Sequence, residues 1–381
     1  MGYINVMKKS NCFVEYFDCI TDYRQEAKVH HLFEEILFIA VAATIANANS
    51  WPNVEEFART HEEWLRQYLE LPYGIPVHDT YERVFDKIDP VQFSKSFITW
   101  SDEIAQRSEG AIVAIDGKTV RRSFDKSTQK SPIHIVNAWI STNNMILGQV
   151  KTSEKSNEIT AIPMLLDMLF LKGCIITIDA MGCQKDIVAK IVDKKADYVI
   201  AVKGNQGNMH KDIIDWFDFA EENKFKDFEH DHFTTRDKGH GRIEKRNYYI
   251  SEDIDWMEYK DNWKNLKSIG MAIRESIQDG KTSIERRYFI TSLKADAKLF
   301  AKAVRSHWGV ESMHWVLDMV FKEDECRERK NFGPENKSLL NKTALNILKQ
   351  YTGDKKSLVT RRYRASMDIK YLSELLFGNK H

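Results

Sequence analysis

Apolar residues recur at helical spacing through the first part of the chain, where they predict four helices. These helices span residues 32–48, 54–71, 79–88 and about 90–105, and Asp79 and Thr80 are candidate N-caps of the third. Pro72 and Gly74 interrupt the pattern between the second helix and the third. We therefore interpret residues 1–110 as a helical domain.

The pattern changes to short apolar runs at residue 111. Runs at 111–116, 133–141, 145–152, 174–180 and 197–203 predict strands, with a hairpin turn at Asn143–Asn144. Helical spacing returns at 157–169 and 184–195. The resulting order β-β-β-α-β-α-β predicts an α/β domain with a mixed sheet and flanking helices.

Residues 204–296 interrupt this order with a stretch that is rich in charge and contains β-like pieces, so we interpret them as a β-rich insertion. A long helix is expected from 297 to 321 and another from 338 to 350. The α/β domain would then span 111–350, and a basic tail would span 351–381.

The net charge of zero conceals an asymmetry along the chain. Residues 1–110 hold 10 Lys and Arg against 18 Asp and Glu, whereas residues 297–381 hold 17 against 10. The basic part is a candidate nucleic-acid footprint, although solvated helix faces explain it equally well.

Several features predict a cytoplasmic protein with no membrane segment. The longest apolar stretch, residues 36–48, is too short to span a bilayer, and the N-terminus has no export signal. The five cysteines are scattered and form no C-x-x-C pair, which is typical of a reducing compartment.

Two acids mark the ends of apolar strands. Asp116 follows AIVAI and Asp179 follows CIITI, and each is followed by a glycine-containing turn. Carboxyl ends of strands border the crevice where α/β sheets bind ligands. If the two strands are adjacent, the carboxylates can share a hard divalent ion such as Mg²⁺.

A third acid, Glu311, lies on the predicted long helix. Helical spacing gathers His307, His314 and Asp318 on the same face. The alternative is a helix that packs through Trp308 and Trp315 and leaves its acids in solvent. The spacing is not H-E-x-x-H, and a single Glu-x-x-His does not make a di-iron site, so we reject a transition-metal site.

Long motifs, in order, resemble the DDE transposases of bacterial insertion sequences, specifically the H-repeat-associated group. They are AIDGKTVR (114–121), TIDAMGCQ (177–184), YVIAVKGNQ (198–206), HGRIEKR (240–246) and HWGVESMHWVLDMVFKED (307–324). HHLFEEIL (30–37) and LPYGIPVHDTYERVF (71–85) resemble the helical domain associated with this group. The resemblance covers nearly the whole chain and implies a ribonuclease-H-like core with Asp116, Asp179 and Glu311 as its catalytic, metal-holding triad.

The chain departs from a signature that many related transposases carry around the Glu, Tyr-x2-Arg-x3-Glu-x6-Lys. Val304, His307 and Asp318 stand at the Tyr, Arg and Lys positions. His307 is a candidate to replace the Arg as a phosphate contact, and Asp318 is a candidate additional metal residue.

Further DNA contacts are expected just beyond the strands and in the insertion. Lys118, Lys203, Asn205 and Gln206 are candidate phosphate contacts, with a solvated-loop role as the alternative for each, and Arg242 and Arg246 are candidates for the DNA end. Gly117-Lys118-Thr119 is not a P-loop, because Ile112 stands where the first glycine is required.

The resemblance implies cleavage and strand transfer at the ends of an insertion sequence, with two Mg²⁺ ions, or Mn²⁺ in their place, and a homodimer on DNA. Two other hypotheses stay open. One is a catalytically silent, transposase-derived DNA-binding protein, and the other is a stand-alone nuclease of the same fold.

Overall fold

The N-terminal part of the chain folds into helices. A computed structural model describes residues 13–25, 29–124, 130–152, 158–239 and 241–378. After a 3₁₀ turn at Phe13–Cys19 come α2 (Phe33–Ile45), α3 (Trp51–Thr60), α4 (Glu62–Leu65), α5 (His78–Phe85) and α6 (Pro90–Ile104). The prediction of one helix over 54–71 was wrong, because α3 ends at Thr60, with His61 as its C-cap, and the short α4 that follows ends at Leu65.

The N-cap prediction for the third helix was also wrong. Helix α5 begins at His78, its N-cap is Val77, and no side chain caps it. Asp79 and Thr80 therefore lie within the first turn, where the negative charge of Asp79 faces the positive end of the helix dipole.

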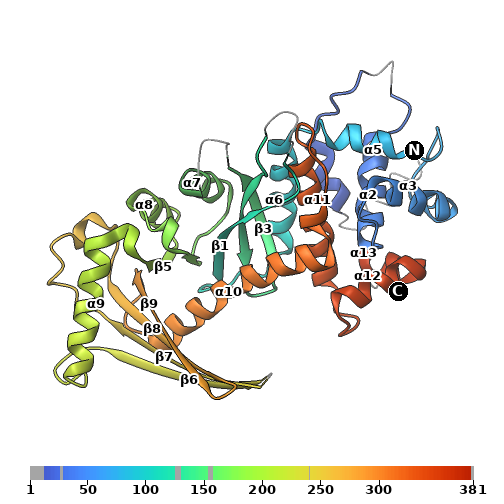
Figure 1. Cartoon of the computed structure of the whole chain (residues 1–381). Helices are drawn as coiled ribbons and strands as arrows, with labels where there is room; N and C mark the ends of the chain where they lie inside the picture. Colours follow the sequence, from blue (N-terminus) through green and yellow to red (C-terminus); the bar gives the residue numbers. More distant parts are fainter. Residues whose placement is uncertain (1–12, 26–28, 125–129, 153–157, 240, 379–381) are drawn as a thin grey trace.

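The predicted mixed sheet is confirmed. Strands β1 (Ile112–Thr119), β2 (His134–Ile140), β3 (Met145–Lys151), β4 (Ile175–Ile178) and β5 (Asp197–Val202) lie in the order β3-β2-β1-β4-β5. β1, β4 and β5 are parallel, and β2 and β3 form the hairpin. Helices α7 (Glu158–Met168) and α8 (Lys185–Asp193) provide the crossovers on one face (Figure 1). The predicted start of α7 at Asn157 lies outside the described residues.

The insertion extends this sheet instead of forming a separate one. It begins with α9 (Gly207–Glu222), a helix that the sequence pattern did not indicate. Strands β6 (Asp231–Gly239), β7 (Arg242–Ser251), β8 (Ser268–Gln278) and β9 (Lys281–Thr291) follow. Because β9 pairs antiparallel with β5, core and insertion form one nine-stranded sheet.

Helix α10 (Ala297–Val320) joins the parts of the molecule. It starts against β6 and β7 of the insertion and runs across the core to the helices beyond β3 (Figure 1). The Asp296 side chain caps it by accepting a hydrogen bond from the Leu299 amide. Gly309 permits its close approach to β2, since a Cβ there would lie 2.2 Å from the Trp139 ring.

The C-terminal residues pack onto the N-terminal helices. Helix α11 (Gly333–Gln350) lies against α2, α6 and β3, while α12 (Leu358–Met367) contacts α2, and α13 (Ile369–Phe377) packs against α2 and α12. Arg362 is 1% exposed and donates a 2.8 Å hydrogen bond to the Thr44 carbonyl. Part of the basic charge of 351–381 is therefore buried and does not face solvent.

Two further observations concern the described residues as a whole. None of their helices combines the length and apolar character needed to cross a membrane. Their cysteines, Cys19, Cys174, Cys183 and Cys326, are free thiols. The fifth, Cys12, lies outside the described residues.

Candidate active site

Asp116 and Asp179 are brought side by side by the parallel pairing of β1 and β4. Ile115 pairs with Ile178, so each acid follows directly after a paired residue. The sequence predicted that Asp116 ends its strand. This was wrong, because β1 continues to Thr119 against β2. Asp116 marks instead the end of the β1–β4 pairing. The Asp179 carboxylate accepts a 3.1 Å hydrogen bond from the Met181 amide.

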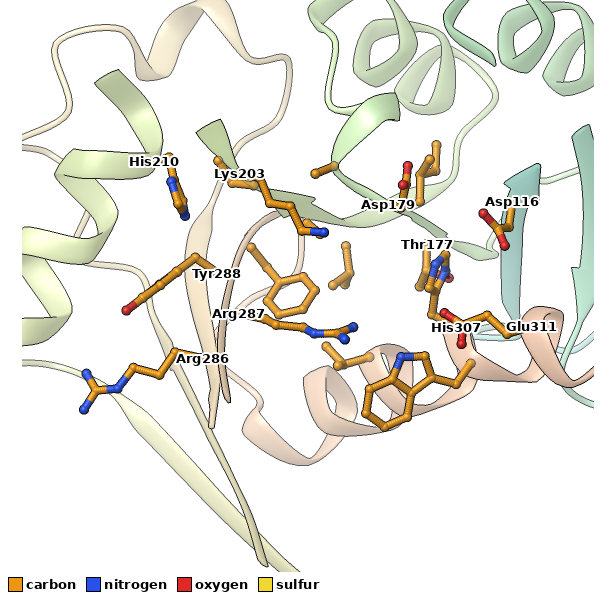
Figure 2. Close-up of a pocket in the computed structure, with 18 residues that line it drawn as sticks. Asp116, Thr177, Asp179, Lys203, His210, Arg286, Arg287, Tyr288, His307 and Glu311 are labelled. Carbon is orange, nitrogen blue, oxygen red and sulfur yellow. Dashed lines mark hydrogen bonds between the residues drawn. The ribbon is translucent and has the colours of Figure 1, made fainter. Parts of the chain in front are cut away.

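Glu311 approaches the same place from α10. A cavity of about 340 Å³ is lined by Asp116, Asp179 and Glu311 together with residues of the insertion. Figure 2 shows the Glu311 carboxylate pointing into the cavity below Asp116, with Lys203 and Arg287 reaching in from the opposite side. Two strands and one helix, distant in sequence, thus place three carboxylates on one cavity.

The electrostatics of this cavity disfavour negative charge. Burial raises the pKa of Asp116 to about 7, and the charges of Glu158, Asp179 and Glu311 add to the rise. The pKa of Asp179 is raised as well, first by burial and then by Glu158. Acids held together against such repulsion are typical of functional sites, because a cation or a proton must compensate them.

The donor set fits a divalent metal ion by its chemistry. All three side chains offer carboxylate oxygens, the ligands that Mg²⁺ prefers, and their mutual repulsion is what a cation relieves. Across the described part of the chain, no three His, Cys, Asp or Glu side chains are grouped closely enough to hold an ion as they stand. Binding would therefore draw the carboxylates together.

His314 contacts Asp116 from the next turn of α10. Its Nδ1 lies 3.6 Å from Asp116 Oδ2, and its Nε2 lies 3.1 Å from Asn137 Nδ2. Because the Asn137 amide nitrogen can only donate, Nε2 accepts and Nδ1 carries the proton that faces Asp116. Burial, followed by the charge of Lys342, lowers the pKa of His314 to about 3, so the ring is neutral at pH 7.

His307 does not replace the positive charge of the Arg in the family signature. Burial lowers its pKa to about 4, so its imidazole is neutral near pH 7. Its Nδ1 lies 3.0 Å from Thr177 Oγ1 on β4. His307 lines the cavity, but as an uncharged ring that joins α10 to the central strand.

Lys118 and Asp318 form an ion pair. Lys118 is 7% exposed, and its Nζ lies 2.6 Å from Asp318, 3.0 Å from Glu323 and 3.5 Å from Asp324. Lys118 is therefore an internal ion-pair partner and not an exposed phosphate contact. Asp318 is correspondingly held in this ion pair and does not line the cavity.

The candidate contacts after β5 divide into two kinds. Lys203 is exposed and lines the cavity, as a phosphate contact should. The amide nitrogens of Asn205 and Gln206 instead donate to the carbonyls of Ala180 (2.6 Å) and Cys183 (2.8 Å). These two side chains fasten the loop after β5 to the loop that carries Asp179.

A second cavity of about 540 Å³ adjoins the first and shares Arg287, Trp308 and Glu311 with it. It contains both insertion arginines expected from the sequence, Arg242 and Arg246, and sequence reasoning missed its other cationic residues. Those are Lys238, Arg274, Arg287 and Arg305. The strand register pairs Arg246 with Arg274 across β7 and β8, and β6, β9 and α10 add Lys238, Arg287 and Arg305.

Trp308 is the centre of this cationic group. The guanidinium carbons of Arg246, Arg287 and Arg305 lie 5.9, 5.3 and 5.3 Å from its ring centroids. Arg246 is also paired with Glu244 and Asp237. Cations exceed acids in the lining, so the cavity is suited to an anion.

This fold is the one expected of the DDE class, and the family comparison agrees. The transposase DDE domain matches residues 107–347, and the domain described as DDE_Tnp_1-associated matches residues 14–101. The chain belongs to the DDE transposase family. The family assignment made from the sequence motifs and the ribonuclease-H-like core are thereby confirmed.

Similar proteins carry related names. "Putative transposase YncI" of Escherichia coli O157:H7 is 44% identical over 368 residues, covering 95% of this chain and 94% of that protein. "H repeat-associated putative transposase YhhI" of E. coli K12 is 41% identical over 372 residues, covering 96% and 98%. The E. coli K12 protein "Inactive transposase YbfQ" is 42% identical over 71 residues, which cover 19% of this chain and 84% of that protein.

Among solved structures, a piggyBac transposase synaptic complex with hairpin DNA is similar at a TM-score of 0.43 and 11% sequence identity. The match covers 97% of this chain and 82% of that chain. At that score the likeness supports no functional argument.

Proposed function

We propose that this protein catalyses divalent-metal-dependent cleavage of DNA at insertion-sequence ends and transfers the freed strand to target DNA. One observation carries the proposal. The cavity that collects Asp116, Asp179 and Glu311 opens beside a second, cationic cavity, and the two share Glu311, Trp308 and Arg287. A site for cations thus adjoins a site for phosphates.

Different residues would bind the metal ions and the DNA. Asp116, Asp179 and Glu311 would hold Mg²⁺, or Mn²⁺ in its place, as a two-ion site. Bound divalent ions supply the acidity that activates a nucleophilic oxygen and neutralise charge on the phosphate. Lys203, Arg287 and the arginines around Trp308 would hold the DNA backbone in register.

His314 has a separate task in this scheme. Its protonated Nδ1 faces Asp116 Oδ2 at 3.6 Å, and the ring is neutral at pH 7. It would orient one oxygen of Asp116 and leave the other for the ion, without competing with the ion as a second positive charge.

Transposition joins two ends, so we expect a homodimer on DNA by analogy with the family. A chain acting on a bacterial chromosome would work in the cytoplasm, at the nucleoid. A stand-alone nuclease of the same fold would cleave without joining. A catalytically silent DNA-binding protein is the other alternative, and it is supported by a relative that is named as an inactive transposase.

The test is nicking of DNA that carries the element's ends, with Mg²⁺ or Mn²⁺, by the wild-type protein and by Asp116→Asn. The wild type should nick and the variant should not, while both retain the same circular dichroism spectrum. Asp186→Asn, which changes an exposed acid in the first turn of α8, is the matched control and should nick normally. Equal nicking by wild type and Asp116→Asn would remove the basis of the proposal.

A further inference from the structure

A fourth carboxylate lies beside the three that the family motif identifies. Glu158 is the first residue of α7, and its side chain is 12% exposed. Its Oε1 lies 2.7 Å from Nε2 of His134 on β2. The same imidazole places Nδ1 2.9 Å from Oγ1 of Thr119 on β1. The Glu158 carboxylate is thus held against the strand that carries Asp116.

Gly117 shows how close the Glu158 carboxylate lies to the backbone of β1. A Cβ on Gly117 would lie 2.0 Å from Glu158 Oε1 and 2.3 Å from His134 Nε2. No side chain other than hydrogen fits at this position without moving both groups. The Glu158 carboxylate therefore covers the peptide that immediately follows Asp116.

The electrostatic effect of Glu158 reaches both aspartates. Among the charges that raise the pKa of Asp116, Glu158 has a larger effect than Asp179 or Glu311. Glu158 is also the largest charge contribution that raises the pKa of Asp179.

A purely structural role accounts for only part of this arrangement. An acid in the first turn of a helix stabilises it through the helix dipole, as Asp186 does on α8. That role is satisfied by a carboxylate in solvent, where it meets no repulsion. The hydrogen bond to His134 accounts for the orientation of Glu158. Neither role compensates the repulsion from Asp116 and Asp179, whose negative charges oppose its own.

We propose that Glu158 is a fourth carboxylate of the metal site, which helps Asp116 and Asp179 to hold the divalent cation, and that His134 fixes its orientation. The inference rests on the proposed function, since it concerns the same site. It places one acid on each of β1 and α7, one just after β4 and one on α10. Together they would offer carboxylates to the cation from helices on both faces of the sheet.

The test is metal binding by Glu158→Gln, which keeps the shape of the side chain and its hydrogen bond to His134 but removes the charge. Titration calorimetry with Mn²⁺, without DNA, should give an affinity lower than that of the wild type by roughly tenfold or more. Asp186→Asn is the control for a first-turn acid and should bind Mn²⁺ like the wild type. Glu158→Ser, which suits a helix N-terminus, should reproduce the loss.

Thermal unfolding distinguishes a metal-holding role of Glu158 from a structural one, because the two roles predict changes in the unfolding temperature of opposite sign. Without metal, Glu158→Gln should unfold at the same temperature as the wild type or higher, because one repelling charge is gone. The rise in unfolding temperature on adding Mn²⁺ should be smaller in the variant. A metal-free variant that unfolds earlier than the wild type, with an undiminished rise on Mn²⁺, would overturn the proposal.

The calorimetry also separates this proposal from the proposed function. Wild-type Mn²⁺ affinity in Glu158→Gln, alongside weakened binding in Asp116→Asn, refutes the role of Glu158 and leaves the DNA chemistry standing. A wild-type protein that binds Mn²⁺ through Glu158 but never nicks DNA refutes the proposed function and leaves the fourth carboxylate standing.

Discussion

Replacing Lys118 by Met should destabilise the junction between β1 and α10 by about 3–5 kcal/mol, the typical result of removing one partner from a buried ion pair. The Lys118 ammonium lies 2.6 Å from Asp318 and 3.0 Å from Glu323, and the Glu323 side chain is 2% exposed. Met preserves most of the apolar stem, so the change removes chiefly the charge. What remains is a buried carboxylate that has lost its nearest cation.

The pH dependence of this effect follows from Glu323. Burial alone would raise its pKa, but Lys118 and Lys342 outweigh it and hold the pKa below the usual value for a glutamate. A depressed carboxyl pKa contributes stability that is present above the unfolded pKa and is lost as pH falls through the folded one. The difference between the wild type and Lys118→Met should therefore be largest near neutral pH and shrink below about pH 4.5.

Urea unfolding followed by tryptophan fluorescence measures the effect. Lys330→Met is the matched control, because the 3.2 Å pair of Lys330 with Glu82 has a lysine that is 73% exposed. Exposed pairs contribute about 0–1 kcal/mol, so this variant should unfold almost like the wild type. The reasoning is refuted if Lys118→Met and Lys330→Met lose the same free energy, or if the loss in Lys118→Met does not depend on pH.

Three further predictions concern the site. Gly117→Ala should lower both the unfolding temperature and the Mn²⁺ affinity, since a Cβ there would lie 2.0 Å from Glu158, and unchanged values in both measurements would contradict the geometry. Arg305→Gln should reduce the slope of log K against log salt for duplex DNA by about 0.9, the contribution of one phosphate. Lys355→Gln, which changes an exposed lysine, is the control, and an equal reduction of its slope would contradict a specific phosphate contact by Arg305. Because the pKa of Asp116 is raised to about 7, Mn²⁺ affinity should increase between about pH 6 and pH 8, whereas a flat calorimetric profile would argue against Asp116 as a ligand.

The acids on the sheet could be predicted because their signal is local. Apolar runs that end in Asp116 and Asp179 indicate strands, and α/β topology brings such strand ends together. Glu311 required the family motif, because its helix face carries other polar groups at equal spacing. The mixed sheet and the β-rich insertion likewise followed from the alternation of short apolar runs.

Long-range contacts account for what the sequence could not predict. Glu158 is an ordinary first-turn acid until β2 supplies His134 and β1 supplies Gly117. The roles of Lys118 and Asp318 depend on a pair 200 positions apart in the chain, which no local pattern encodes. The register of β7 with β8 similarly brings Arg274 next to Arg246, which the sequence pattern did not indicate.

The most direct test of the central claim is strand transfer with pre-cut ends. Short duplexes that expose the element's 3′-hydroxyl are incubated with a supercoiled target plasmid, Mg²⁺ and either the wild type or Asp116→Asn, Asp179→Asn or Glu311→Gln. The account predicts joined products with the wild type alone, and DNA binding that persists in all three variants. Joined products of equal yield from any of these variants, or no joining by a wild-type protein that still nicks, would contradict it.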